Sequence, residues 1–274
     1  MLTDADVERW LTEDVGHHDV TNEVPGETAG RLVAKESGVA AGVDAASAVF
    51  DYLDATVTER VGDGTAVEPG DALLRVEGPA KSVLRGERAA VNVAAHASGV
   101  ATRTDAAVAA AREIDDGVRI AATRKTTPGL RGVEKRAVAA AGGDTHRLDL
   151  SHMAMVKDNH VAELGLEGAI ERVRERASFA TALDVEVEDP ADAARAAEAG
   201  ADVVLLDNMM PAETATAAER VAGADGDALT EASGGITVET VPDYAATGVD
   251  VISMGGLTHS APALDLSFRT GGDG

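Results

Sequence analysis

The sequence predicts an α/β protein with two domains, the second of which is built on a parallel β-sheet. Residues 62–77 alternate tight-turn signals with short apolar runs, as antiparallel strands do. From residue 118 onward, apolar segments alternate with helical patterns, as in repeated βα units. Polar residues or glycines end these apolar segments, which favours a barrel whose active site lies at the carboxyl ends of its strands.

The composition limits the fold and excludes several functions. A chain of 274 residues can form one barrel-sized domain or two smaller ones, and the absence of cysteine excludes disulfides and thiolate chemistry. The 48 acidic and 24 basic side chains give a net charge of -24, which argues against nucleic acid as a partner. Apolar runs fall short of the roughly 20 residues of a membrane span, and the first ten residues lack a signal-peptide core. We therefore expect a soluble, cytoplasmic protein, whose acidity is typical of a surface adapted to high salt.

The first hundred residues predict helices and antiparallel strands. A helix is expected over residues 3–13, and strands are expected over residues 31–41 and 55–60. The adjacent His17 and His18 have no third ligand near them in the sequence, so surface positions are expected for both.

Residues 62–77 predict a small antiparallel hairpin unit, similar to the half-motif of biotinyl and lipoyl carrier domains. A carrier would have a lysine at the hairpin tip, where this chain has Glu68, Pro69 and Gly70. The hairpin is therefore expected as a structural unit without a carrier role.

Two helices are predicted next, over residues 86–99 and 102–114, with a domain boundary at about residue 100. The strands and helices expected after this boundary alternate. The strands are predicted at 118–123, 148–156, 181–187, 202–206, 228–232 and 249–254, and the later helices at 190–199, 211–222 and 238–246. An open doubly wound sheet and a barrel both fit this order, although no glycine-rich dinucleotide fingerprint follows the first strand.

The segment from Arg119 to His160 reverses the charge of the chain, with eight basic and four acidic residues. A local excess of four positive charges predicts a pocket for a strongly anionic ligand. Three of these cations have helical spacing and are expected on a solvated helix face: Arg131, Lys135 and Arg136. Four others follow short apolar runs and are expected at strand ends: Arg124, Lys125, Arg147 and Lys157.

Two further groups of residues follow predicted strands. Gly-Gly turns after the last two strands, Ser233-Gly234-Gly235 and Gly255-Gly256, are typical of phosphate binding by backbone N–H groups. Glu186 and Asp207 offer carboxylates for sugar hydroxyls or for Mg²⁺, with a solvated strand end and a helix cap as the alternatives. No nucleophile–base pair and no zinc-type spacing is seen.

Together, the motifs closely resemble those of the quinolinate phosphoribosyltransferase family. The resemblance covers residues 11–268 and is carried by TRKTTPGLR, GGDTHRL, KDNH, LDVEVED, VVLLDNMMP, EASGGI and ISMGGLTHS, preceded by LTEDVGHHDVT and GERAAVNVAAHASGVAT. It implies an incomplete barrel of six or seven strands over residues 101–262. It also implies an N-terminal α/β sandwich domain over residues 1–100, joined by residues 263–274, and a head-to-tail homodimer with shared active sites.

The resemblance also implies the reaction, in which quinolinate and phosphoribosyl pyrophosphate give nicotinate mononucleotide, pyrophosphate and CO₂. It implies Mg²⁺, bound mainly through phosphoribosyl pyrophosphate. Lys125, Glu186 and Asp207 are expected to act in catalysis. The residues that it implies in binding quinolinate, ribose or phosphate are Arg88 of the partner subunit, Thr123, Arg124, Lys125, His146, Arg147, Lys157, Glu186, Asp207, Ser233, Gly234, Gly235, Gly255 and Gly256. Asp149 departs from the family, which has a small residue near this position.

Three alternatives remain at this point. A paralogue associated with molybdate transport would share the motifs but act on another substrate. A nicotinate phosphoribosyltransferase would need fewer cations, because its substrate has one carboxylate. A non-enzymatic anion-binding or carrier module would be built on the hairpin unit.

Overall fold

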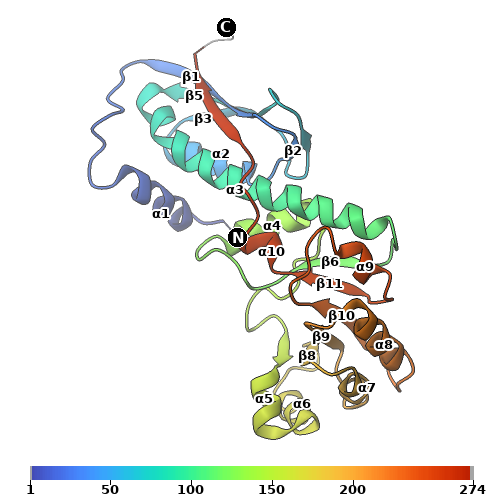
Figure 1. The fold of residues 1–274 in the computed structure, drawn as a ribbon. Helices are drawn as coiled ribbons and strands as arrows, with labels where there is room; N and C mark the ends of the chain where they lie inside the picture. Colours follow the sequence, from blue (N-terminus) through green and yellow to red (C-terminus); the bar gives the residue numbers. More distant parts are fainter. Residues whose placement is uncertain (1, 272–274) are drawn as a thin grey trace. The chain divides into compact units, whose positions relative to one another are not determined.

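The computed structural model describes residues 2–271 and divides into two compact units (Figure 1). The first unit contains residues 2–105, 126–142 and 260–271, and the second contains Ala106–Lys125 and Gly143–His259. This grouping differs from the predicted division mainly at residues 126–142, which pack with the N-terminal residues. No helix in the described part of the chain has an apolar stretch long enough for a bilayer.

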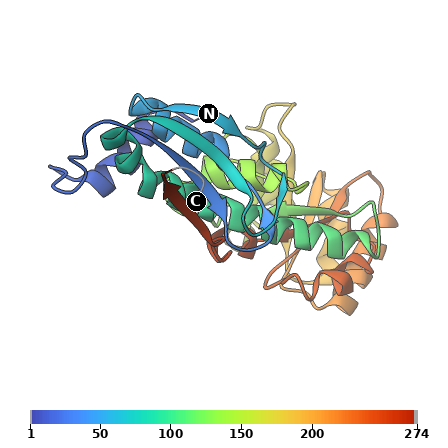
Figure 2. The same ribbon diagram turned by 90° about the horizontal axis from the view of Figure 1, so that it is seen from above.

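The first unit is built on a four-stranded antiparallel sheet in the order β12-β1-β5-β3, with helices against it (Figures 1 and 2). The ring of Phe268 on the last strand stacks on Phe50 at 5.6 Å between centroids, so the C-terminal strand is part of this core. The elements are α1 (Asp4–Val15), β1 (Glu27–Ala34), β2 (Gly38–Val39), α2 (Val43–Tyr52), β3 (Thr56–Arg60), β4 (Ala66–Val67), β5 (Ala72–Pro79), α3 (Ala80–Arg112), α4 (Arg131–Ala140) and β12 (Leu266–Thr270). The last residues of α3, from Ala106 onward, belong to the second unit.

The strands of the predicted hairpin do not pair with each other. β4 pairs with β2, whereas β5 pairs with β1 and β3. The intervening turn explains this arrangement, because the Gly70 N–H donates to the Ala34 carbonyl and the Ala34 N–H donates to the Asp71 carbonyl. These bonds hold the turn against the end of β1. The strand predicted over residues 31–41 is likewise divided between β1 and β2.

The two helices predicted on either side of residue 100 are one continuous helix, α3. Gly99, taken in the sequence as the end of the first helix, lies inside α3. A Cβ atom at this position would lie 2.0 Å from the Pro262 carbonyl oxygen. The glycine therefore permits a close approach of two backbones, and the prediction of a helix end was wrong.

The second unit contains six parallel strands, paired in the order β6-β11-β10-β9-β8-β7. From β7 to β11, each strand pairs with the next one along the chain, and β11 pairs with β6, as in a β/α barrel. β6 and β7 are the two edge strands of this sheet, so the barrel is incomplete, as predicted. The elements are β6 (Arg119–Ala122), β7 (Ala154–Val156), α5 (Asp158–Leu164), α6 (Leu166–Arg174), β8 (Leu183–Val187), α7 (Pro190–Glu198), β9 (Val203–Asp207), α8 (Pro211–Ala222), β10 (Leu229–Ser233), α9 (Val241–Ala245), β11 (Val251–Met254) and α10 (Gly256–His259).

The predicted strand over residues 148–156 is much shorter in the structure, where only Ala154–Val156 forms β7. The Asp149 carboxylate accepts hydrogen bonds from the Ser151 N–H at 2.8 Å and the Ser151 hydroxyl at 2.6 Å. A side chain that bonds to the backbone two residues further on stabilises a turn. Asp149, the departure from the family pattern, therefore turns the chain before β7.

Candidate active site

One cavity of about 370 Å³ lies at the carboxyl ends of the barrel strands, within the second unit. Nine of the residues singled out in the sequence line it together: Thr123, Arg124, Lys125, His146, Arg147, Lys157, Glu186, Asp207 and Ser233. They meet there because the carboxyl ends of parallel strands converge at one end of a barrel. The cavity is also lined by four residues that the sequence analysis did not select: Met155, Leu205, Glu231 and Ser253.

Arg147 is the most buried cation of this cavity, with 8% of the residue exposed. Its Nε donates to the Asp149 carbonyl oxygen at 3.3 Å, and its Nη1 lies 3.3 Å from the Met155 sulfur. Burial, and then the nearby charge of Arg124, lower the pKa of the Arg147 guanidinium from its ordinary value. A guanidinium so close to another cation and largely removed from water is suited to binding an anion.

Two carboxylates and a lysine occupy another part of the cavity. Lys157 forms an ion pair with Glu186. Burial, and then the charge of Glu186, raise the pKa of the Asp207 carboxyl. Two oxygen-ligand groups that repel each other provide the type of donor set that Mg²⁺ prefers.

The two Gly-Gly turns follow β10 and β11 directly. Gly234 has a φ of 102°, and a Cβ atom there would lie 2.3 Å from the Asn208 Oδ1 atom. A Cβ atom on Gly255 would lie 3.0 Å from the Lys125 Cδ atom and 3.3 Å from the Thr123 Oγ1 atom. These two positions therefore favour a residue without a side chain, and Gly235, with a φ of 64°, has a backbone conformation that favours glycine. Gly256 follows Gly255 as the first residue of α10.

Arg88 is the one predicted site residue that belongs to the first unit, on α3. Its side chain is 59% exposed, and its Nη2 lies 3.9 Å from the Glu87 carboxylate. The cations expected to face solvent on α4 differ from one another. Arg136 is exposed and Arg131 is half-buried, but Lys135 is only 3% exposed. The prediction for Lys135 was wrong, because the buried face of α4 extends to this residue. His17 and His18 are exposed, as predicted.

A second polar group inside the barrel escaped the sequence analysis. Glu231 on β10 is 1% exposed, and its Oε2 lies 2.8 Å from the His146 Nε2. Asp184 on β8 is fully buried. Both side chains lie two residues before a strand-end residue that lines the cavity, Ser233 and Glu186 respectively. Their positions could have been predicted from this spacing, because side chains two residues apart on a strand point to the same face of the sheet.

The carboxyl group of Asp184 has an unfavourable environment. Within residues 2–271, neither of its oxygens has a hydrogen-bond partner. Burial, and then the charge of Glu231, raise its pKa to about 8. His146, Asp184 and Glu231 each offer one ligand atom, and these atoms lie within 4.8 Å of one another, so the three residues together have donor atoms for a cation.

Comparison with known families agrees with this geometry. A family model described as quinolinate phosphoribosyl transferase, N-terminal domain, matches residues 19–98, and one described as the C-terminal domain matches residues 100–269. The chain belongs to the quinolinate phosphoribosyl transferase family. This confirms the resemblance found in the sequence motifs.

Individual relatives cover nearly the whole chain. The probable nicotinate-nucleotide pyrophosphorylase (carboxylating) of Methanothermobacter thermautotrophicus is 44% identical over 97% of this chain and 98% of its own. The human nicotinate-nucleotide pyrophosphorylase (carboxylating) is 42% identical over 96% of this chain and 90% of its own. The crystal structure of NadC from Streptococcus pyogenes has a TM-score of 0.89 and 37% identity over 99% of this chain and 98% of that chain.

Proposed function

We propose that this protein transfers the phosphoribosyl group of phosphoribosyl pyrophosphate to quinolinate, with loss of CO₂. The products are nicotinate mononucleotide and pyrophosphate. The observation that carries the proposal is one cavity that combines Arg124 and Arg147 with the carboxylates Glu186 and Asp207, and with Ser233 at the start of a glycine turn. The relatives are named nicotinate-nucleotide pyrophosphorylases, which supports this activity over a carrier module or a paralogue with another substrate.

Quinolinate would bind at the cationic part of the cavity. Its two carboxylates require more than one fixed cation, and Arg124, Arg147, His146 and Lys157 line the same space. Arg147 is largely desolvated, so a carboxylate that bonds to it forms a strong charge-assisted pair. Lys125 also lines the cavity, where an ammonium group can bind anionic oxygens of either substrate.

Phosphoribosyl pyrophosphate would bind at the carboxylates and the glycine turns. Glu186 and Asp207 can accept hydrogen bonds from ribose hydroxyls, and both fit Mg²⁺ that arrives with the pyrophosphate. The metal would neutralise charge on the departing pyrophosphate. Ser233 and the backbone N–H groups of the turns at Gly234 and Gly255 can donate to phosphate oxygens.

Catalysis would depend on positioning and electrostatics. The pyridine nitrogen displaces pyrophosphate at the anomeric carbon, and positive charge develops on the sugar in the transition state. The carboxylates of Glu186 and Asp207 stabilise that charge, and the cations stabilise the leaving group. The ring nitrogen becomes positively charged, so the electrons of the neighbouring C–C bond can remain on the ring when CO₂ departs.

Product analysis tests the activity. Quinolinate with phosphoribosyl pyrophosphate and Mg²⁺ should give CO₂ and nicotinate mononucleotide in equal amounts. Nicotinate should be at least about 100-fold worse in kcat/KM, because losing a charge-assisted pair in a closed site costs about 2–3 kcal/mol. Equal use of nicotinate, or no CO₂ from quinolinate, would contradict the proposal.

The proposal includes a homodimer in which Arg88 enters the partner's active site. Arg88→Ala and Lys157→Ala should each be nearly inactive alone. When the two are refolded together, half of the dimers are hybrids with one repaired site of two, so about a quarter of wild-type activity should return. A mixture that exchanges subunits but stays inactive would exclude a role of Arg88 across the interface.

The proposed reaction also suggests where the protein works. Phosphoribosyl pyrophosphate is highly charged and does not cross membranes unaided. We therefore propose that the protein works in the cytoplasm, the compartment that would retain phosphoribosyl pyrophosphate.

A further inference from the structure

The interior of the barrel beneath the cavity contains an unusual concentration of polar side chains. Asp184, Glu231 and Ser253 are each no more than 2% exposed. Within residues 2–271, four of their oxygen atoms have no hydrogen-bond partner: Asp184 Oδ1 and Oδ2, Glu231 Oε1 and Ser253 Oγ. Unpaired polar atoms destabilise a folded protein, so this layer is not explained by stability.

Glu231 connects this layer to the cavity, which it lines together with His146. The 2.8 Å between the His146 Nε2 and the Glu231 Oε2 is a hydrogen-bond distance, so one proton is shared by this pair. The backbone of His146 also supports this contact. It has a φ of 50°, which is uncommon for a residue with a side chain, and its N–H donates to the Asp144 carboxylate at 2.6 Å.

Asp184 adds to the polar surroundings of this pair without bonding to it. Within residues 2–271 its carboxylate oxygens have no hydrogen-bond partner, so the Glu231 Oε2 remains the contact of the imidazole. A carboxylate at hydrogen-bond distance favours a protonated imidazole.

We propose that Glu231 is a positioning residue that holds His146 as an imidazolium, and that His146 returns a proton to the pyridine ring after CO₂ leaves. The inference rests on the proposed function, because it concerns the second half of that reaction. The bond between the ring carbon and the carboxylate breaks, and its electron pair stays on the ring carbon. An N–H bond of His146 then breaks, a C–H bond forms on the ring, and the neutral imidazole regains a proton from water.

His146 is the best-suited proton donor of this cavity. The guanidinium groups of Arg124 and Arg147 are too weakly acidic to donate. Lys157 is paired with Glu186. Lysine ammonium groups have ordinary pKa values near 10.4, whereas imidazolium, near 6.5, is the better acid at neutral pH. The charged groups around His146 and its partners come from several elements: Asp184 and Glu186 of β8, Glu231 of β10, Lys157, Arg124, Arg147, Asp144 and Asp149.

The decisive experiment is a single-turnover comparison of wild type with Glu231→Gln, using quinolinate, phosphoribosyl pyrophosphate and Mg²⁺. Pyrophosphate and CO₂ are measured in the same reaction. Pyrophosphate should form at close to the wild-type rate. Release of CO₂ should slow by at least about tenfold, because an unprotonated ring recaptures CO₂. The ribosylated dicarboxylate should accumulate.

Two controls make the result specific. Glu171→Gln removes an exposed carboxylate from α6 and should leave both rates unchanged. Glu231→Asp keeps the charge and should recover part of the CO₂ rate. Circular dichroism and melting establish that each variant is folded.

The pH profile gives a second, independent measurement. The wild-type CO₂ rate should fall as pH rises and His146 loses its proton. In Glu231→Gln this fall should begin at lower pH, since the charge that favours the imidazolium is gone. This shift of the pH profile can be measured even if Glu231→Gln is less stable than wild type.

Each outcome has a distinct meaning. If Glu231→Gln slows the formation of pyrophosphate and of CO₂ equally and leaves the pH profile unchanged, the role of Glu231 and His146 is overturned. The proposed function would remain intact. Absence of both products in the wild type would instead overturn the proposed function.

Discussion

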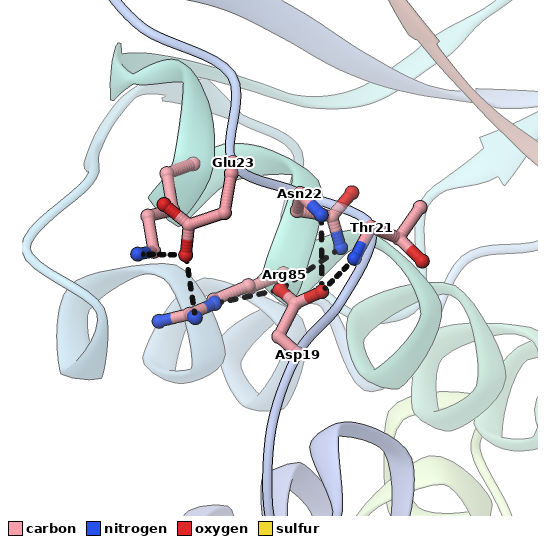
Figure 3. A network of polar contacts seen from close by, with 6 residues as sticks. Asp19, Thr21, Asn22, Glu23 and Arg85 are labelled. Carbon is pink, nitrogen blue, oxygen red and sulfur yellow. Dashed lines mark hydrogen bonds and ion pairs between the residues drawn. The ribbon is translucent and has the colours of Figure 1, made fainter.

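Asp19 in the first unit and Asp184 in the second are both poorly exposed aspartates, yet their surroundings are opposite. The side chain of Asp19 is 7% exposed and accepts hydrogen bonds from Arg85 Nε at 2.7 Å, Thr21 N at 2.9 Å, and Asn22 N at 3.0 Å and Nδ2 at 3.2 Å (Figure 3). The Arg85 bond, followed by the backbone bonds, lowers the pKa of Asp19. Asp184 accepts no hydrogen bond within residues 2–271, and its pKa is raised to about 8.

The comparison distinguishes a poorly exposed carboxylate that stabilises the fold through its hydrogen bonds from one that contributes no such bonds. Asp19, together with Glu23, fastens the loop after α1 to Arg85 and Lys81 of α3 (Figure 3). It lies close to the turn of α3 that carries Arg88, three residues after Arg85. Asp184 has no hydrogen-bond partner among residues 2–271, and it lies near His146 and Glu231, which line the cavity. We infer that the first network serves the fold and the second serves the reaction.

The largest expected effect is the loss of activity in Arg147→Ala. Arg147 is buried beside the cavity, so kcat/KM for quinolinate should fall by at least about 100-fold, equivalent to about 3 kcal/mol of binding to a charged group. Arg172→Ala is the matched control, because Arg172 pairs with Glu175 on the surface. Steady-state rates and circular dichroism make the measurement, and an active Arg147→Ala would place the substrate elsewhere.

The next effect concerns Asp184→Asn. Asp184 has a raised pKa, so its contribution to stability is fully present below the unfolded value near 3.9 and is lost as pH rises toward about 8. A neutral amide of similar shape removes this loss, so the variant should be more stable than wild type at pH 8, on the order of 1–3 kcal/mol. Urea unfolding from pH 4 to pH 9 tests this. A variant that is less stable at every pH would show that Asp184 has a structural bond.

Sequence reasoning succeeded best where topology brings residues together. Arg124, Lys157 and Asp207 were selected because they follow apolar segments, and parallel strands carry such residues to one end of a barrel. Asp184 and Glu231 were missed because both lie inside strands that were correctly predicted, over 181–187 and 228–232, whereas candidates were sought at the carboxyl ends of strands. Their burial depends on partners from other strands, and a single sequence does not specify those partners.

Smaller errors have the same origin. The role of Gly99 depends on the distant Pro262, and the burial of Lys135 depends on how α4 packs. The local helix propensity of the sequence gives no information about either of these long-range contacts. The predicted helix over 211–222 matched α8 because proline at the start and an apolar stripe are local signals.

A smaller effect is expected for Asp19→Asn. The pKa of Asp19 is lowered, so its stabilising contribution is present above the unfolded pKa near 3.9 and is lost as pH falls toward the folded value. The variant should melt a few kelvin lower at pH 7, and this difference should shrink in acid. Its loop after α1 should also be cut faster by proteases. An unchanged melting temperature at pH 7 would mean that the Arg85 pair adds no stability, as for many surface ion pairs.

The smallest effect to resolve is the response of these variants to salt. With 48 acidic and 24 basic side chains, like charges repel across the surface, and KCl should raise the melting temperature of wild type by screening them. Salt also weakens the partly exposed Asp19–Arg85 pair, so the deficit of Asp19→Asn should shrink as KCl increases. The difference between Asp184→Asn and wild type should change less, because buried groups are poorly screened. Melting curves from low salt to about 3 M KCl separate these responses. A flat or falling wild-type curve would leave the acidity as a feature of solubility alone, and equal salt responses of the two variants would remove the distinction between the two aspartates.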